Sequence, residues 1–238
     1  MMTRFDPSDS SGLGCLSGSS WQPVPPAALS PVQKDWLTRG GGLTQRLCTL
    51  GRVQVQVVDE RVGQGWSDEL ACLGLSARTP VWVSEVVLYV DQVALVAAHS
   101  ITPLRASRGT WQAIRSLGTR PLAELLYADP SVERSVLVNR RLTARHPLHR
   151  YAARWTDARV TSLVARRSVF ERHRTPLLVT ECMLPALWQR LVAPHQTPTA
   201  HLHGAHHVGP VRLGTRLSQA PAKAQGAGEI ADGPRRPR

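Results

Sequence analysis

Residues 81–102 read VWVSEVVLYVDQVALVAAHSIT and predict a β-hairpin, from which much of the fold follows. Two apolar runs rich in valine flank Asp91 and Gln92, and β-branched residues favour strands. If Asp91 and Gln92 form a two-residue turn, Val90 faces Val93 and Ser84 faces His99. Ser84 and His99 then share one face of the hairpin, where the neighbouring residues are apolar: Trp82, Val86, Leu88, Leu95 and Ile101. Such a polar pair is either a self-satisfied core contact or part of a site.

Further strands are predicted on both sides of this hairpin. In residues 52–58, Val53, Val55 and Val57 alternate with polar residues, which is the period of a half-buried strand. Turn residues bound three more candidates, at 132–142, 163–172 and 177–184. Helical patterns are short and occupy Pro31–Leu37, Leu43–Leu50, Thr110–Leu117 and Leu122–Tyr127. Because the strand connections are short, antiparallel pairing is favoured. We therefore predict an α+β fold with a single six-stranded antiparallel sheet and helices on one face.

The two ends of the chain differ in composition from the middle. Residues 1–30 are rich in Ser, Gly and Pro, and residues 193–238 are rich in Pro, Gly, Ala, His and Arg. Neither segment has an apolar period, so neither can bury enough apolar surface to form a core. We expect a disordered N-terminal tail (1–30), one compact domain (31–192) and a disordered C-terminal tail (193–238).

Composition and charge limit the location and the partners of the protein. The 238-residue chain has no apolar run near the length of about 20 residues that a membrane span needs, and no signal-peptide pattern at its start. Its four cysteines lie far apart, so we expect reduced thiols in a cytoplasmic protein. The net charge of +12 comes mainly from scattered arginines, which favours an anionic small-molecule ligand over nucleic acid.

A second predicted hairpin places a carboxylate in an apolar row. Alternation brings four residues to one face: Leu177, Val179, Glu181 and Met183. With a two-residue turn at His173 and Arg174, Arg166 lies opposite Glu181. A glutamate is rarely buried without a partner. Arg166 and Glu181 therefore form either a structural ion pair or a charged pair that lines a pocket.

Residues 166–188, RRSVFERHRTPLLVTECMLPALW, resemble the C-terminal signature of the chorismate pyruvate-lyase family. The resemblance continues through four more segments: DWLTRGGGLTQRL (35–47), VWVSEVVLYV (81–90), AAHSITPL (97–104) and LGTRPLAELLY (117–127). It implies a carbon–oxygen lyase that converts chorismate to 4-hydroxybenzoate and pyruvate for ubiquinone biosynthesis. It also implies a monomer without a cofactor, in which helical flaps bury the ligand against the sheet.

The resemblance also implies which residues bind the substrate. The family holds its ligand with a glutamate in TE-x-x-LP and a leucine in PL-x-x-LL, which are Glu181 and Leu122 here, while a hydrophobic residue before T-x-R, here Leu43, approaches it. Glu181 is the expected catalytic residue, which orients the ring hydroxyl. The arginine that grips the ring carboxylate in the family is replaced by Ser84, which cannot bind a carboxylate through two donors. Protonated His99, across the predicted hairpin, is the expected substitute.

Some alternatives remain open at this stage. Arg166 and Arg167 are more distant candidates for the missing carboxylate contact. The loss of the family arginine at position 84 is also compatible with a non-catalytic sensor domain of the same fold. A third class, metal binding, would depend on four histidines of the C-terminal tail: His201, His203, His206 and His207. Because no acidic or cysteine partner accompanies them, we expect no functional metal site.

Overall fold

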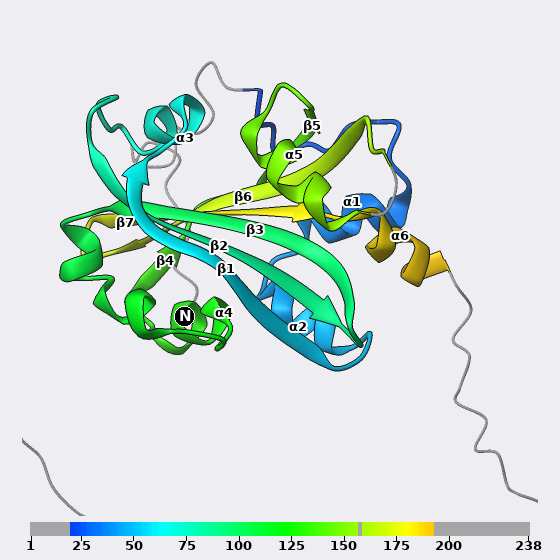
Figure 1. The fold of residues 1–238 in the computed structure, drawn as a ribbon, viewed down its shortest axis with the longest axis horizontal. Helices are drawn as coiled ribbons and strands as arrows, with labels where there is room; N and C mark the ends of the chain where they lie inside the picture. Colours follow the sequence, from blue (N-terminus) through cyan, green and yellow to red (C-terminus); the bar gives the residue numbers. More distant parts are fainter. Residues whose placement is uncertain (1–19, 157–158, 193–238) are drawn as a thin grey trace, which may run out of the picture. The chain divides into compact units, whose positions relative to one another are not determined.

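The computed structural model describes residues 20–156 and 159–192, and its centre is a seven-stranded antiparallel sheet (Figure 1). The strand order is β1-β2-β3-β7-β6-β4, and β5 also pairs with β6. The strands are β1 (Val53–Gln64), β2 (Pro80–Val90), β3 (Val93–Pro103), β4 (Val132–Arg134), β5 (Val138–Thr143), β6 (Ser162–Arg172) and β7 (Thr175–Met183). The α+β class and the antiparallel sheet are confirmed.

The sheet has seven strands instead of six because the predicted strand 132–142 is divided. Both halves, β4 and β5, pair with β6. Between them, the Ser135 hydroxyl accepts a hydrogen bond from the Val169 amide at 2.9 Å. A side chain thus takes the place of a backbone acceptor and interrupts the regular ladder.

Helices cover both faces of the sheet, so the expectation that they gather on one face is wrong. They are α1 (Pro31–Thr38), α2 (Leu43–Cys48), α3 (Ser67–Cys72), α4 (Leu122–Ala128), α5 (Pro147–Ala152) and α6 (Pro185–Val192), with short 3-10 turns η1 (Ala106–Arg108), η2 (Gln112–Ser116) and η3 (Ala153–Trp155). One core cluster joins α5 to Val87 and Cys182, whereas another joins α1, α2 and α6 to Leu88 and Met183. Consecutive strand residues point to opposite faces, so these clusters lie on opposite sides of the sheet. Figure 1 shows α3 and α5 on one side and α2 and α4 on the other.

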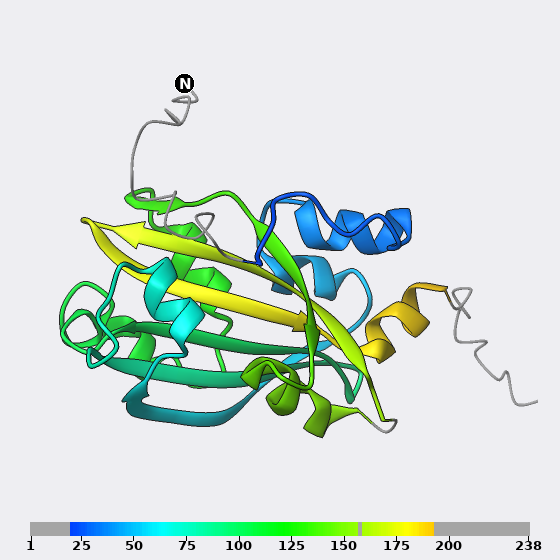
Figure 2. The same cartoon turned by 90° about the horizontal axis from the view of Figure 1, so that it is seen from above.

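Helices α1 and α2 lie side by side in Figure 2. Ser30 and Gln33 form a capping box around Pro31, which gives α1 a defined start. Arg46 of α2 forms an ion pair with Asp35 and lies over the Trp36 ring at 4.0 Å. These contacts join the two short helices across the three glycines at 40–42.

Both predicted two-residue turns are present. Val90 pairs with Val93, and Arg172 pairs with Thr175. All four turn residues have positive φ: Asp91 46°, Gln92 69°, His173 50° and Arg174 57°. This is the backbone of the turns that match the twist of a tight hairpin. In the second hairpin, the predicted pairing of Arg166 with Glu181 is confirmed.

A bulge changes the register of the first hairpin. Tyr89 pairs with Ala94 but Leu88 pairs with Val96, so Leu95 is an extra residue in β3. Beyond this point Ser84 pairs with Ser100, and Glu85 pairs with His99. His99 therefore points to the face opposite Ser84, and the prediction that they share a face is wrong.

The folded part of the chain begins before Pro31. Trp21 is 1% exposed, and its indole Nε1 donates to Asp68 Oδ2 at 3.0 Å. Gln22 forms an isolated bridge with Asn139. Residues 20–30 thus pack on the domain, although the sequence places them in the tail. Residues 1–19 and 193–238, with the four tail histidines, lie outside the described residues.

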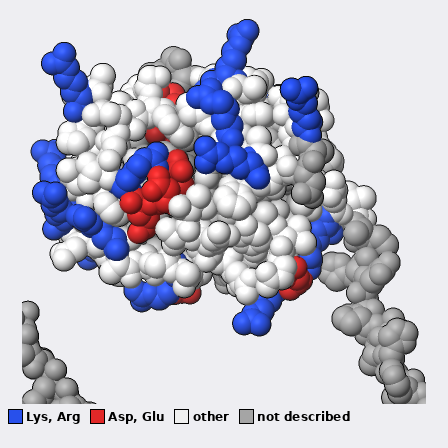
Figure 3. All heavy atoms as spheres, in the orientation of Figure 1, with Lys and Arg blue, Asp and Glu red and all other residues white. Residues whose placement is uncertain are grey.

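Two further sequence expectations concern cysteines and surface charge. Cys48 and Cys182 are free thiols, as the sequence predicted for these two cysteines. On the face shown in Figure 3, lysines and arginines stand in several separate groups, and the acidic residues form a larger central patch and smaller ones near the edges. No helix among residues 20–156 and 159–192 has the length and apolar character needed to cross a bilayer.

Candidate active site

A cavity lies between the sheet and two segments that we call the first flap (residues 39–48) and the second flap (residues 117–128). Polar groups reach it from the strands: Glu60 (β1), Ser84 (β2), Ser100 (β3), Arg134 (β4), Arg166 and Ser168 (β6), and Glu181 (β7). Its other walls are largely apolar and include Leu43, Val86, Leu88, Leu122, Leu126, Phe170 and Val179. Apolar walls with a few convergent polar groups are typical of a small-molecule site.

Arg166 and Glu181 form an ion pair that lines this cavity. Arg166 Nε donates to Glu181 Oε2 at 2.6 Å, and the Arg166 side chain is only 2% exposed. Arg166 Nη1 also donates to the carbonyls of Trp36 and Arg39 at 3.1 and 3.2 Å. These carbonyls lie at the C-terminal end of α1, where a positive charge is favourable. The pair therefore both lines the pocket and fastens the first flap to the sheet.

Ser84 lies in the cavity next to a second glutamate. Ser84 Oγ donates to Glu60 Oε1 at 3.3 Å. Burial raises the pKa of Glu60, while the Ser84 hydrogen bond and the charge of Arg115 partly oppose this shift. The position at which the family resemblance expects an arginine is therefore occupied by Ser84, and the Glu60 carboxylate lies beside it. The sequence pattern missed Glu60 because β1 continues to Gln64, beyond its predicted end, and the register shift between Val57 and Asp59 brings Glu60 to the face of Val55.

Leu43 and Leu122 both line the cavity, as the resemblance implies. Leu43 begins α2 and is 3% exposed, and Leu122 begins α4. The two flaps approach each other at Gly42, where an added Cβ would lie 3.3 Å from Ala123 Cβ and 3.5 Å from Tyr127 Cε2. Glycine thus permits a closer contact between the flaps than a larger residue would allow.

Arg134 is a cavity residue that no sequence motif indicated. Its Nε donates to Ser168 Oγ at 2.9 Å, and its Nη1 donates to the Gly41 carbonyl at 3.1 Å and to the Tyr127 hydroxyl at 2.7 Å. Its guanidinium also lies 5.2 Å from the Phe170 ring centroid. Burial lowers the pKa of Arg134, although Tyr127 and Glu181 act in the opposite direction. One side chain therefore joins the sheet to both flaps.

His99 does not reach the cavity but belongs to a buried cluster on the other face. Its Nε2 lies 3.3 Å from Glu69 Oε1, and its Nδ1 lies 3.3 Å from Glu85 Oε1. Trp66 stacks on the imidazole at 4.0 Å between centroids. Burial lowers the pKa of His99, but the two carboxylates outweigh this effect and raise it. Arg167 belongs to the same face and lies 3.0 Å from Asp68, so neither residue replaces the missing arginine.

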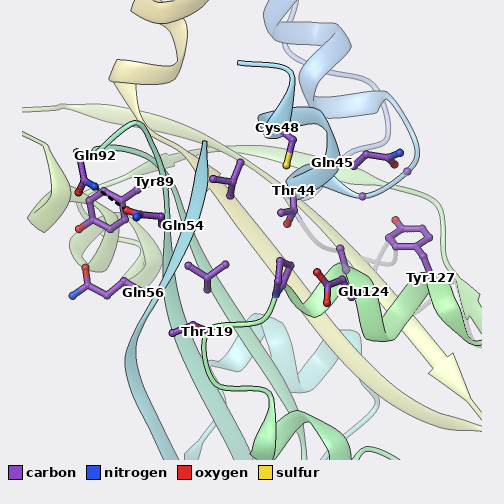
Figure 4. A pocket seen from close by; sticks show the side chains of 16 residues that line it. Thr44, Gln45, Cys48, Gln54, Gln56, Tyr89, Gln92, Thr119, Glu124 and Tyr127 are labelled. Atoms are coloured by element: carbon purple, nitrogen blue, oxygen red, sulfur yellow. Dashed lines mark hydrogen bonds between the residues drawn. The ribbon is translucent and has the colours of Figure 1, made fainter. Parts of the chain in front are cut away.

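A groove of about 1180 Å³ lies on the outer side of the flaps (Figure 4). Side chains of α2, β1 and α4 line it, among them Thr44, Gln45, Gln54, Gln56, Glu124 and Tyr127. Several residues border both the groove and the cavity: Gly41, Gly42, Thr44, Val55, Pro121, Ala123 and Tyr127. The cavity and the groove are therefore adjacent, and these flap and strand residues border both.

Comparison with known proteins agrees with this arrangement. A family model described as chorismate lyase matches residues 15–193. A probable chorismate pyruvate-lyase from Bordetella pertussis is 47% identical over 176 residues, which cover 73% of this chain and 93% of that protein. The corresponding protein of Bordetella avium is 43% identical over 185 residues (78% and 93%), and probable chorismate pyruvate-lyase 1 of Burkholderia pseudomallei is 35% identical over 172 residues (72% and 93%). The family match includes all seven strands and both flaps, so the chain belongs to the chorismate lyase family and is a lyase.

Proposed function

We propose that this protein is a chorismate pyruvate-lyase, which converts chorismate to 4-hydroxybenzoate and pyruvate. The observation that carries the proposal is Glu181, held by Arg166 at 2.6 Å in an otherwise largely apolar cavity beneath two flaps. Relatives at 43% and 47% identity, matched over 93% of their own length, have this activity in their names. A sensor domain that binds without turnover is not favoured, because these relatives are named as lyases.

The reaction needs orientation more than strong acid or base. The ring carbon that bears the hydroxyl loses its proton, and the released electron pair makes the ring aromatic. The bond from the ring to the ether oxygen breaks at the same time, and the leaving enolpyruvate takes up a proton to become pyruvate. Aromatisation supplies the driving force. Fixing the substrate in a reactive geometry can then account for much of the rate.

We assign Glu181 to this orienting role. An ionised carboxylate only accepts hydrogen bonds, so Glu181 suits a ring hydroxyl as its partner. Its side chain is 16% exposed and its position is defined by Arg166, which also contacts the end of α1. The hydroxyl and the carbon that loses its proton would thereby be held in place. Glu181 is accordingly the proposed catalytic residue.

The apolar residues and the flaps have a different role. Leu43 and Leu122 close the cavity against water, which strengthens the polar interactions inside it. Because residues of both flaps line the cavity and also border the groove beside it, we expect the product to leave when the flaps separate. We therefore infer that release of 4-hydroxybenzoate limits turnover. We further propose a cytoplasmic monomer that works without a cofactor and supplies the ubiquinone ring.

The test is turnover by the full-length protein with chorismate alone. Equal amounts of 4-hydroxybenzoate and pyruvate are expected without added metal or nucleotide, and a chelator is expected to change nothing. Glu181→Gln keeps the size of the side chain and removes its charge, so we expect a large loss of kcat. A folded protein that binds 4-hydroxybenzoate but releases no pyruvate would instead be the sensor.

A further inference from the structure

The cavity contains an arginine that forms no direct ion pair with a carboxylate of the described residues, although the charge of Glu181 acts on it. Three arginines line it: Arg120, Arg134 and Arg166. Arg166 is paired with Glu181, and Arg120 is exposed to solvent. Arg134 donates its three hydrogen bonds to neutral oxygen atoms, and it forms no ion pair within residues 20–156 and 159–192. A partly buried cation of this kind gains stability when an anion enters the cavity.

The geometry of Arg134 suits a carboxylate. Its Nε and Nη1 are held by Ser168, Gly41 and Tyr127, and none of these bonds uses Nη2. A guanidinium fixed in this way has its remaining donors set in direction before a ligand arrives, which favours the planar carboxylate group. The fixed orientation depends on both flaps, so the donors are in place only when both flaps are closed.

The opposite end of the cavity has the opposite charge. Ser84 lies on β2 beside Glu60, whereas Arg134 lies on β4, and β3, β7 and β6 separate the two positions. A carboxylate near Ser84 meets Glu60, whose charge Arg115 offsets in part without forming an ion pair. A carboxylate near Arg134 meets a guanidinium. The charge distribution therefore draws an anionic group toward Arg134.

We propose that Arg134 binds a carboxylate of the ligand and takes over, in this chain, the charge role of the arginine that the family resemblance expects at position 84. The proposal rests on the proposed function in one respect, since it takes a hydroxybenzoate as the ligand. It concerns ligand recognition and is independent of whether turnover occurs.

The experiment compares the dissociation constants of 4-hydroxybenzoate and its neutral analogue 4-hydroxybenzamide by titration calorimetry. The ratio of the two constants measures how strongly the protein prefers the carboxylate. Arg134→Met is expected to reduce this preference roughly tenfold or more, mostly through weaker binding of the benzoate. Arg78→Met, which removes an exposed arginine that does not line the cavity, is the matched control and is expected to leave the preference unchanged.

A second neutral variant of Arg134 distinguishes the loss of the charge from a misfolded protein. Arg134→Gln keeps a donor for Ser168 and loses the charge, so it is expected to give the same drop in preference. Tyr127→Phe removes one bond that orients the guanidinium and is expected to give a smaller drop. An unchanged preference in both neutral Arg134 variants overturns the inference, as does equal weakening of both ligands. A protein with a normal Arg134 effect but no pyruvate release would refute the proposed function alone.

Discussion

Replacing Arg166 with methionine should destabilise the protein strongly. The Arg166 side chain is 2% exposed and donates to Glu181 and to the carbonyls of Trp36 and Arg39. Arg166→Met removes all three bonds and leaves Glu181 in the cavity without its partner. Breaking a buried ion pair costs about 3–5 kcal/mol. Because Glu181 is 16% exposed and regains some hydration, we expect about 3 kcal/mol, at the lower end of this range.

Urea unfolding followed by tryptophan fluorescence and far-UV circular dichroism measures this loss. Arg39→Met is the matched control, because Arg39 is 65% exposed in its pair with Asp35 and should contribute less than about 1 kcal/mol. The double variant Arg166→Met/Glu181→Leu removes the unpaired charge and should recover at least half of the loss. A cost for Arg166→Met no larger than that of Arg39→Met would refute the reasoning, as would a double variant no more stable than the single one.

Three further predictions concern the contact between the flaps, Ser84 in the cavity and His99 on the opposite face of the sheet. Gly42→Val should hold the flaps apart and weaken 4-hydroxybenzoate binding, whereas Gly40→Val, whose added Cβ meets nothing within 4 Å, should bind normally; equal affinities would contradict the flap contact. Ser84→Arg should change the affinity for 4-hydroxybenzoate by less than about threefold in calorimetry, because the new guanidinium pairs with Glu60 while the ligand carboxylate lies at Arg134; a roughly tenfold tighter complex would instead place the carboxylate at residue 84. His99→Gln should lower the free energy of unfolding more at pH 6 than at pH 9. Two glutamates raise the folded-state pKa of His99, so its stabilising charge is fully present below pH of about 6.5 and is lost as the pH rises through the raised pKa. Equal losses at both pH values would show that the charge contributes nothing.

Local patterns in the sequence were sufficient to predict the turns of both hairpins and the charged pair in the cavity. The turns at Asp91–Gln92 and His173–Arg174 are set by neighbouring residues, and alternation along β6 and β7 follows from strand geometry. Arg166 and Glu181 therefore face each other as predicted. The positions of Leu43 and Leu122 over the sheet were indicated by family motifs, and both leucines line the cavity.

Beyond the Arg166–Glu181 pair, only the tertiary structure decided which polar residues meet in the cavity. The extra residue Leu95 has no signal in the alternating pattern, yet it moves His99 to the opposite face from Ser84. Arg134 becomes part of the cavity only because β4 pairs with β6 and both flaps close over it. Strand periodicity depends on adjacent residues. The bulge in β3 and the contacts of Arg134 with the sheet and both flaps depend instead on the packing of segments that are distant in sequence.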